Sequence, residues 1–399
     1  YALAAVGKNC MTIVSDEFSL LTLTEIADKI KSGSVSSLAI TEAQLRRIAR
    51  LEPDLHAYAQ VMETSALEQA KAADEEIAAG GRRGPLHGVP IAVKDLCWIE
   101  GVPTRAGTLV HDKFVPGEDA TVVRRLRQAG AIIVGKTQMT EGAYSDYHPA
   151  ITPPVNPWHA DYWAGISSSG SAVATAASLC FGAIASDTGG SIRWPAAANG
   201  VTGLKPTWGR VSRYGVFDLA PSLDHIGTIA RSAMDAGILL MAIAGSDPKD
   251  PTAAAQAVPD FASASQSSIG GMRIGFDPRW NSEDVEPQTQ AALAAAADVF
   301  TALGAHMVEI RFPDVSQAVA DWVPNCAVEA AAVHERDFAA NRDLYGPILA
   351  GVIEMGKAVS EAEYQQILLR RAIFRRDVEA QFASVDLILT PVQPFAPLT

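Results

Sequence analysis

Residues 164–193 read AGISSSGSAVATAASLCFGAIASDTGGSIR, with a loop of small residues on either side of an apolar segment. The first loop is expected to lead into a helix over 172–181, with Ser171 or Ser169 as its N-cap. The 25 residues from Tyr162 to Ser186 contain no charged residue and no histidine, and could cross a bilayer by length alone. Because glycine and serine crowd the first half, we expect a buried segment with a tight turn and not a membrane span.

Outside this segment, apolar runs of strand length alternate with helical patterns. A capping box of Thr22 and Glu25 indicates a first helix that ends near Gly33. Further helices are expected from about residue 37 and over 66–79, 120–128, 232–244, 287–303 and 361–382, and strands over 89–93, 131–134, 273–276, 307–310 and 387–390. This alternation predicts a single large α/β domain with a central mixed, twisted β-sheet covered on both faces by α-helices. A serine- and alanine-rich stretch over 261–268 is expected to be a surface linker.

The composition excludes several classes of protein. The chain has 399 residues, of which 48% are hydrophobic and 19% charged, so it can bury a sizeable core. Its formal charge of −13 opposes non-specific binding to nucleic acid or to anionic membranes. Cys10, Cys97, Cys180 and Cys326 lie far apart without a metal-ligand spacing, so we expect reduced thiols, a cytoplasmic location and no metal site.

Residues 130–137 read GAIIVGKT and match the phosphate-loop pattern of nucleotide-binding proteins. That motif needs a flexible loop between a strand and a helix. Here the residues between the two glycines are Ala, Ile, Ile and Val, which are themselves expected to form a strand. Gly130 would then end the preceding helix and Gly135 the strand, so we do not expect nucleotide binding.

The second loop, Asp187 to Arg193, places Ser191 directly after two glycines. Backbone N–H groups at such a turn can point at one oxygen atom, as an oxyanion hole requires. Taken alone, this stretch and the serine loop at 165–171 also fit ordinary turns. A serine hydroxyl becomes a strong nucleophile only when a base takes its proton, so the chemistry depends on which base lies nearby.

The sequence offers two kinds of candidate base for a serine nucleophile. His148, His159 and His225 flank the two loops, so a Ser-His-Asp arrangement is one alternative. Lys94 follows the apolar strand of 89–93, where burial would favour its neutral form. To act as a base near neutral pH, its pKa would have to fall from about 10.4 toward roughly 7–8. The other reading of Lys94 is an ion pair at the surface with Asp95 or another carboxylate.

These stretches together resemble the amidase signature family. The resemblance rests on residues 88–95, 165–171, 187–193 and 203–212, with supporting matches at 134–137, 156–158 and 221–227. It follows the family order from about residue 22 to the end of the sequence. It implies the amidase signature fold, hydrolysis of the carbon–nitrogen bond of a linear amide, and no metal or organic cofactor.

The resemblance also implies roles for individual residues. Ser191 would be the nucleophile, Ser167 a bridging serine preceded by a cis peptide bond, and Lys94 the base. The backbone N–H groups of Thr188, Gly189, Gly190 and Ser191 would hold the oxyanion of an acyl-enzyme pathway. Ser168, Arg193 and Asp187 would hold these groups in position without reacting themselves.

The chain departs from the family pattern in places. Ile166 and Ser169 stand where the family commonly has glycine in the serine loop, and their side chains are expected to reshape the acyl pocket. We expect residues 1–21 to be an N-terminal extension, in part a remnant of cloning. Residues 22–399 are expected to form the amidase signature domain without its usual C-terminal end.

Aromatic residues cluster between 144 and 163, just before the serine loop. Tyr144, Trp163 and Ile166 are candidates to line an apolar substrate pocket, although packing of a long loop onto the core explains the aromatic residues equally well. The expected substrate is a small neutral amide, including aryl amides (anilides). Carbamates (urethanes) and esters are open to the same chemistry, and we expect a monomer or homodimer.

The alternative function is that of the A subunit of the glutamine-dependent Glu-tRNA(Gln)/Asp-tRNA(Asn) amidotransferase. In that protein, an arginine in a basic stretch binds the glutamine carboxylate, whereas residues 347–356 here contain no basic residue. The charge of −13 also counts against a tRNA-linked role. We therefore favour the hydrolase that acts on a small molecule.

Overall fold

The computed structural model describes residues 17–264 and 266–395, and its contacts divide the chain into two compact units. Of the described residues, one unit holds 17–262 together with 333–351, and the other holds 263–332 and 352–395. A four-residue helix, α8 (Phe261–Ala264), stands where the sequence indicated a linker, and the boundary between the units falls inside it. Cys10 and most of the expected N-terminal extension lie outside the described residues.

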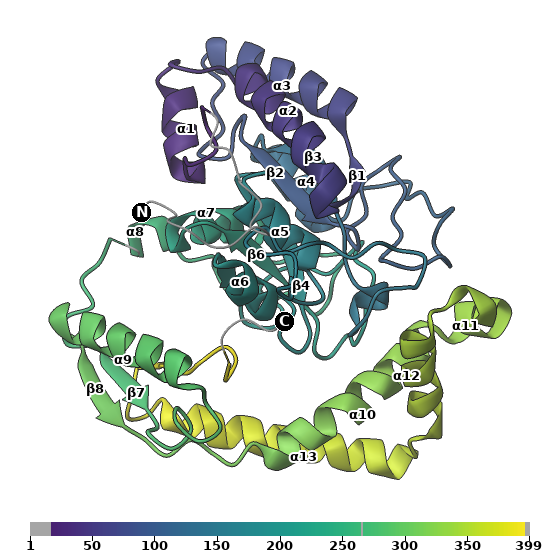
Figure 1. Cartoon of the computed structure of the whole chain (residues 1–399), viewed down its shortest axis with the longest axis vertical. Coiled ribbons are helices and arrows are strands. Elements are labelled where there is room, and N and C mark those ends of the chain that lie inside the picture. The colour runs from purple at the N-terminus through teal and green to yellow at the C-terminus, as the bar shows by residue number, and fades with distance from the viewer. Residues whose placement is uncertain (1–16, 265, 396–399) are drawn as a thin grey trace. The chain divides into compact units, whose positions relative to one another are not determined.

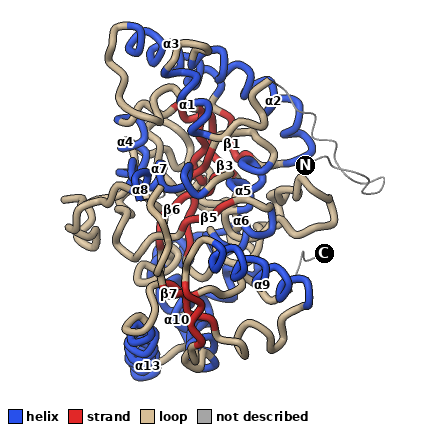
Figure 2. The backbone as a smooth tube through the Cα atoms, turned by 90° about the vertical axis from the view of Figure 1, so that its left-hand side faces the viewer, coloured by secondary structure: helices blue, strands red, loops and turns tan. Residues whose placement is uncertain are grey.

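The first unit is built on a six-stranded mixed sheet, which confirms the expected α/β fold with a central sheet flanked by helices. Its strands are β1 (Tyr58–Val61), β2 (Pro90–Lys94), β3 (Ile132–Thr137), β4 (Gly182–Asp187), β5 (Thr202–Leu204) and β6 (His225–Ala230). They lie in the order β1-β3-β2-β4-β6-β5. β2 is parallel to β3 and β4, and the remaining pairs are antiparallel. Figure 2 shows these strands in red with blue helices around them.

Helices of the first unit surround this sheet (Figure 1). They are α1 (Leu23–Lys31), α2 (Ser37–Leu55), α3 (Glu63–Ala78), α4 (Thr121–Gln128), α5 (Ser169–Ala176), α6 (Arg193–Asn199) and α7 (Ala233–Ile243). The first unit also contains α11 (Glu335–Asn341) and 3-10 turns at Glu141–Ala143 and Arg342–Leu344. The predicted capping box is confirmed, because Thr22 Oγ1 accepts from Glu25 N and Glu25 accepts from Thr22 N at 2.7 Å. α12 (Pro347–Ala358) crosses the boundary between the units.

The core of the first unit is densest where α2 and α3 meet the sheet. Ile48 of α2, Ala66 and Ala70 of α3 and Val134 of β3 belong to one cluster of buried side chains. Alanine on α3 lets that helix approach the sheet closely, and each large aliphatic side chain buried here contributes about 1.5–3 kcal/mol. β2 lies in the interior of the sheet, and its five residues are all buried.

The second unit has its own parallel sheet of three strands in the order β8-β7-β9. Its elements are β7 (Arg273–Phe276), α9 (Pro287–Ala302), β8 (His306–Glu309), α10 (Ser316–Val333), α13 (Glu361–Gln381) and β9 (Leu387–Ile388). The predicted strands and the helices α9 and α13 are therefore confirmed, whereas α10 was not foreseen. Within this unit, the guanidinium of Arg370 on α13 donates to both carboxylate oxygens of Asp321 on α10 at 2.7 and 2.8 Å.

The apolar segment over 162–186 is divided between a loop, the short helix α5 and strand β4. Its predicted helix was misplaced, because α5 begins at Ser169 with Ser168 at the N-cap position and ends at Ala176. Ser171 is not a cap, since its hydroxyl donates to Ile184 O on β4 at 3.1 Å. Among residues 17–264 and 266–395, no helix is both long and apolar enough to cross a membrane.

The Gly-Lys-Thr sequence that resembles a phosphate loop lies inside β3. Residues 135–137 pair with β2 on one side and with β1 on the other, so their backbone groups belong to the sheet. Gly130 has a φ of +80° directly after α4, as expected for a glycine that ends a helix. The structure therefore agrees with the prediction that this stretch is not a nucleotide-binding loop.

Candidate active site

Lys94, the last residue of β2, is fully buried beneath the serine loop. Its Nζ donates hydrogen bonds to the hydroxyl oxygens of Ser167 at 2.7 Å, Ser168 at 2.8 Å and Ser186 at 2.8 Å. The alternative of a surface pair with Asp95 is wrong, since Asp95 Oδ1 is 2.8 Å from the Nζ of the buried Lys136. The hydrogen-bond partners of the Lys94 amine are therefore the hydroxyl groups of three serines.

Burial lowers the pKa of Lys94 to about 7, although the nearby carboxyl groups of Asp187 and Asp224 act in the opposite direction. Hydroxyl oxygens stabilise an ammonium less than a paired carboxylate would, so they do not restore its ordinary pKa. A large fraction of this amine is consequently neutral near pH 7. The neutral form donates only two of these three hydrogen bonds and accepts the third through its lone pair, so it can take a proton from a serine hydroxyl.

The loop that carries Ser167 lies tightly against α6. Gly165 has a φ of +79°, and a Cβ at this position would lie 2.2 Å from Cα of Pro195. Only glycine permits so close an approach of two backbones. The peptide bond between Ile166 and Ser167, which follow this glycine, is cis.

Ser168 connects the serine loop to β4. Its Oγ donates to Ser186 O at 3.1 Å and accepts from Ser186 N at 3.3 Å, besides accepting from Lys94. Because β4 runs parallel to β2, the C-terminal ends of both strands lie at the same edge of the sheet. Ser168 thus holds the serine loop at the edge where both Lys94 and the 187–193 turn are found.

Asp187, at the end of β4, organises the turn that contains Ser191. Its Oδ1 accepts from Gly190 N at 2.9 Å and its Oδ2 from Ile192 N at 3.1 Å, while the Arg193 guanidinium donates to both oxygens at 2.8 and 3.0 Å. Burial acts to raise the pKa of Asp187, but these donors hold it below its ordinary value. The carboxylate therefore stays charged and keeps the turn closed.

Ser191 is 9% exposed at the tip of this turn. The N–H of Gly190 already donates to Asp187, and this bond competes with the oxyanion role expected for Gly190. The Thr188 hydroxyl donates to Asp224 Oδ1 at 2.6 Å, so the side chain of Thr188 is not an oxyanion donor; the group expected to act there is its backbone N–H. The bonds of Thr188 and Gly190 fix the residues on either side of Gly189, and Gly190 directly precedes Ser191.

The three histidines considered as bases have local partners. His225 Nδ1 lies 3.1 Å from Asp187 O, and burial lowers the pKa of this ring to about 4. His148 Nδ1 accepts from Ala150 N at 3.1 Å, and His159 Nδ1 accepts from Asp161 N at 3.2 Å. Among the residues that the structure describes, none of these rings is hydrogen-bonded to Ser167 or Ser191, so the Ser-His-Asp alternative has no support.

Of the residues expected to line a pocket, Tyr144, Trp163 and Ile166 are all partly buried. The backbone near Tyr144 is attached to the serine loop, since Thr140 N donates to Ser167 O at 3.3 Å and Thr140 Oγ1 donates to Tyr144 O at 2.6 Å. By contrast, Trp158 Nε1 donates to the backbone of Asn199 at 2.8 Å, which is the loop-packing role.

Trp194 was missed from sequence. Its ring lies 6.3 Å from that of Trp163, and a Cβ on Gly190 would come within 2.8 Å of it. Trp194 therefore packs on the turn next to Ser191, and Trp163 lies beside Trp194. The only available signal was its position three residues after the predicted nucleophile, since no motif singles it out.

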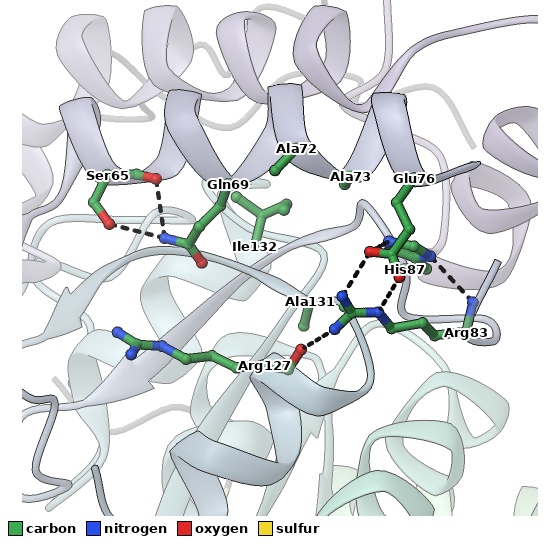
Figure 3. A pocket seen from close by; sticks show the side chains of 11 residues that line it. Ser65, Gln69, Ala72, Ala73, Glu76, Arg83, His87, Arg127, Ala131 and Ile132 are labelled. Atoms are coloured by element: carbon green, nitrogen blue, oxygen red, sulfur yellow. Dashed lines mark hydrogen bonds and ion pairs between the residues drawn. The ribbon is translucent and has the colours of Figure 1, made fainter. Parts of the chain in front are cut away.

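A second cavity of about 350 Å³ lies between α3 and the start of β3 (Figure 3). Its charged side chains are already paired, since Glu76 pairs with Arg83 at 2.6 Å and Arg127 pairs with Asp119, outside the lining, at 2.8 Å. His87 precedes β2 and Gly130 precedes β3, so this cavity is at the edge of the sheet opposite Lys94. It is not part of the serine site.

Comparison with known proteins gives one consistent result. A family model described as Amidase matches residues 39–399. The protein named "Putative amidase AmiD" of Mycobacterium tuberculosis (strain ATCC 25618 / H37Rv) is 49% identical over 377 residues, which cover 94% of this chain and 79% of that protein. The A subunit of glutamyl-tRNA(Gln) amidotransferase from Synechococcus sp. (strain CC9311) is 37% identical over 94% of this chain and 82% of its own.

A solved structure gives the same result for the fold. The crystal structure of a bacterial aryl acylamidase of the amidase signature family matches with a TM-score of 0.86 at 27% identity, over 95% of this chain and 81% of that one. Sequence relatives and a structural relative therefore agree over nearly the whole chain.

Proposed function

The chain belongs to the amidase signature family of hydrolases, and we propose that it cleaves the C–N bond of a small neutral amide through an acyl-enzyme on Ser191. The observation that carries this proposal is the buried Lys94 amine, 2.7 Å from the Ser167 hydroxyl and with a pKa of about 7. A buried amine bound only to hydroxyl groups is suited to accept a proton from a serine.

In the proposed first step, neutral Lys94 takes a proton from Ser167 Oγ while Ser167 takes the proton of Ser191 Oγ. Ser191 Oγ then forms a bond to the carbonyl carbon, and the carbonyl electron pair moves onto oxygen. The proton returns through Ser167 to the amide nitrogen as the C–N bond breaks, because an amide anion is a very poor leaving group. Water then hydrolyses the ester to Ser191 and releases the acid.

The oxyanion of this pathway needs backbone donors. We propose the N–H groups of Gly189 and Ser191 as the principal ones, with Thr188 beside them, because Gly190 N–H is engaged by Asp187. Asp187, Arg193 and Ser168 act as positioning residues through the hydrogen bonds that hold the two loops.

The substrate class follows from the same surroundings. Trp194 packs on the turn of Ser191 with Trp163 beside it, and we propose that aryl amides are accepted, as the name of the aryl acylamidase indicates for that relative. Carbamates and esters present a similar carbonyl carbon to the nucleophile and are proposed as secondary substrates. Tyr144 and Ile166 are the other proposed pocket residues.

The amidotransferase A-chain function remains the second candidate because of the 37% identity to that relative. The higher identity of 49% to AmiD and the absence of a basic residue over 347–356 favour the amidase. We propose action in the cytoplasm as a monomer or homodimer, in keeping with the buried thiols Cys97, Cys180 and Cys326. Glutaminase activity that requires copurifying proteins would overturn this choice.

A sulfonyl fluoride should label Ser191 in the purified protein. The reagent transfers its sulfonyl group to a serine oxygen that a neighbouring base has activated, and peptide mass spectrometry locates the adduct. We expect about one adduct per chain, on the peptide that contains Ser191, with simultaneous loss of amide hydrolysis. An adduct on Ser167, or activity that survives complete labelling, would contradict the proposal.

The kcat/KM for an amide should rise with pH to a plateau, with a midpoint near the pKa of about 7 of Lys94. The sign follows from the chemistry, because only the neutral amine accepts a proton and protonation below the midpoint removes it. The decline should be roughly tenfold per pH unit on the acid side. A rate independent of pH between about 5 and 8, in protein whose circular dichroism is unchanged, would contradict this role of Lys94.

A further inference from the structure

A small cavity of about 90 Å³ is lined in part by residues of the 139–143 segment, which is hydrogen-bonded to the serine loop, and it has no part in the chemistry described above. Residues from three separate segments of the first unit line it: Ala106 and His111, Met139 to Ala143, and Val333 to Asp337, with Phe217 and Asp218 from a fourth. Its volume corresponds to about three water molecules, which suits the end of a substrate and not a whole one.

The wall of this cavity is attached to the catalytic residues by backbone hydrogen bonds. Thr140 N donates to Ser167 O at 3.3 Å, Gly142 N donates to Ala106 O at 2.9 Å, and Ala106 N donates to the carbonyl of Asp95 at 3.2 Å. Asp95 directly follows Lys94. The cavity therefore shares its wall with the loops that place Ser167 and Lys94.

The same wall contains unusual backbone conformations. Ala106, Gly142 and Ala143 all have left-handed φ angles, of 52°, 56° and 61°. Such angles are uncommon for residues with a Cβ, and they concentrate at ligand sites, where the surrounding structure enforces them. Alanine at two of these positions adds only a methyl group.

The polar groups of the wall are mainly hydrogen-bond acceptors. His111 Nε2 lies 3.3 Å from Asp337 Oδ2, so the carboxylate favours the tautomer with its proton on Nε2, which leaves Nδ1 as an acceptor. His111 Nδ1 is buried and has no hydrogen-bond partner in the part of the chain that the structure describes. Asp218 and Asp337 are the charged residues of the lining, although Asp218 is also bound by Arg213 at 3.1 Å.

His334 adds a second buried ring nitrogen whose hydrogen-bonding capacity is unused by the described residues. Burial lowers its pKa to about 4, so the ring is neutral, and Nδ1 lies 3.1 Å from the Tyr345 hydroxyl. Within the described residues, the buried Nε2 has no hydrogen-bond partner. A buried polar atom without a partner is costly, and a ligand group that bonded to it would remove that cost.

The rest of the lining is apolar. The Phe217 ring stacks on His111 at 4.2 Å with an angle of 7° between the rings, and Met139 and Val333 complete the wall. A fully charged group would lose its hydration on entering so small a space, which is costly. The lining therefore matches an uncharged group with an apolar body and a terminal N–H or O–H.

We propose that this cavity binds the end of the amide substrate remote from the scissile bond, and that it selects an uncharged group that ends in a hydroxyl or in a neutral N–H donor such as a carboxamide. This inference rests on the proposed function. His111 is the specificity-determining residue, because its Nδ1 accepts the hydrogen bond of the ligand, and His334 is the second polar contact.

The test compares matched amides that differ only at the remote end, in one series on the acyl side and in another on the amine side. The groups are hydroxyl, methoxy, methyl and carboxylate. The methoxy group can accept but not donate, so kcat/KM for the hydroxyl compound should exceed that for the methoxy compound by roughly tenfold in one series. The carboxylate should be the poorest because Asp218 and Asp337 repel it.

His111→Phe should abolish the preference for hydroxyl over methoxy while keeping the ring stacked on Phe217. Because the preference is a ratio within one variant, it does not depend on the fraction of folded protein. His306→Phe, at an exposed position on β8, is the matched control and should keep the preference. If His111→Phe does not fold, Asp337→Asn is the second test. It should weaken the preference because it removes the carboxylate that holds the proton of His111 on Nε2.

Calorimetry on the Ser191→Ala protein measures binding of the same amides without turnover, and the hydroxyl compound should again bind more tightly than the methoxy compound. Equal values for the two compounds in the wild type, or a preference that persists in His111→Phe, would overturn the inference. If the sulfonyl fluoride fails to label Ser191, the proposed function itself fails, so the two failures are distinguishable.

Discussion

Ser191→Ala is expected to lower kcat for amide hydrolysis by roughly 10⁴- to 10⁶-fold, to the level that binding and the oxyanion donors alone sustain. The acyl-enzyme cannot form without the hydroxyl oxygen. The substitution removes only one oxygen atom from a small side chain and introduces no new group, so it should change thermal unfolding little. Product formation from an anilide under saturating conditions measures the loss.

The matched control for this prediction is Ser34→Ala, an exposed serine near the end of α1 that should retain full activity. The Ser191→Ala protein should also fail to react with the sulfonyl fluoride. Activity within tenfold of the wild type in a folded Ser191→Ala protein would rule out Ser191 as the nucleophile. Retained labelling at Ser167 would point to a different nucleophile.

Lys94→Met is expected to lower kcat by roughly 10²- to 10⁴-fold, which is the usual contribution of a positioned general base. Methionine keeps much of the volume of the buried side chain but removes the amine that now donates to three serine hydroxyls. The loss should fall mainly on kcat, because Lys94 is proposed to move protons and not to bind substrate.

Two comparisons separate this effect from damage to the fold. An aryl ester with a good leaving group should lose less activity than an amide, since its leaving group needs no proton. Lys29→Met, an exposed position on α1, should behave as the wild type. Equal losses for ester and amide, together with an unchanged pH profile in Lys94→Met, would show that Lys94 is not the base.

Much of the fold was predictable because local patterns determine it. The capping box at Thr22 and the β-branched run of β3 needed only neighbouring residues to be recognised. α10 was not foreseen, since it contains Pro324 and many alanines, and its apolar residues do not form a clear stripe. The start of α5 was misplaced because the serine hydroxyls that were expected to cap it bond to β4 and to neighbouring loops.

The candidate site divides in the same way. Lys94, Ser167 and Ser191 could be named from motifs, each of which is a short stretch of sequence. No local sequence pattern indicated that the Gly190 N–H donates to Asp187, or that Trp194 packs on the turn that contains Ser191. Nor could the sequence indicate that Glu141 accepts from Gly346 N at 3.0 Å, a bond that joins residues 205 positions apart.

The sequence by itself determined the family, the α/β class and the candidates for nucleophile and base, because side-chain chemistry and strand or helix periodicity are local properties. Only the tertiary structure decided how those residues meet. Burial of Lys94 among three hydroxyls, and with it a pKa of about 7, arises from strands and loops that are 73 to 92 residues apart. The acceptor-lined cavity likewise exists only because the chain returns at 333–351 to the first unit, and desolvation and hydrogen-bond satisfaction depend on such distant contacts.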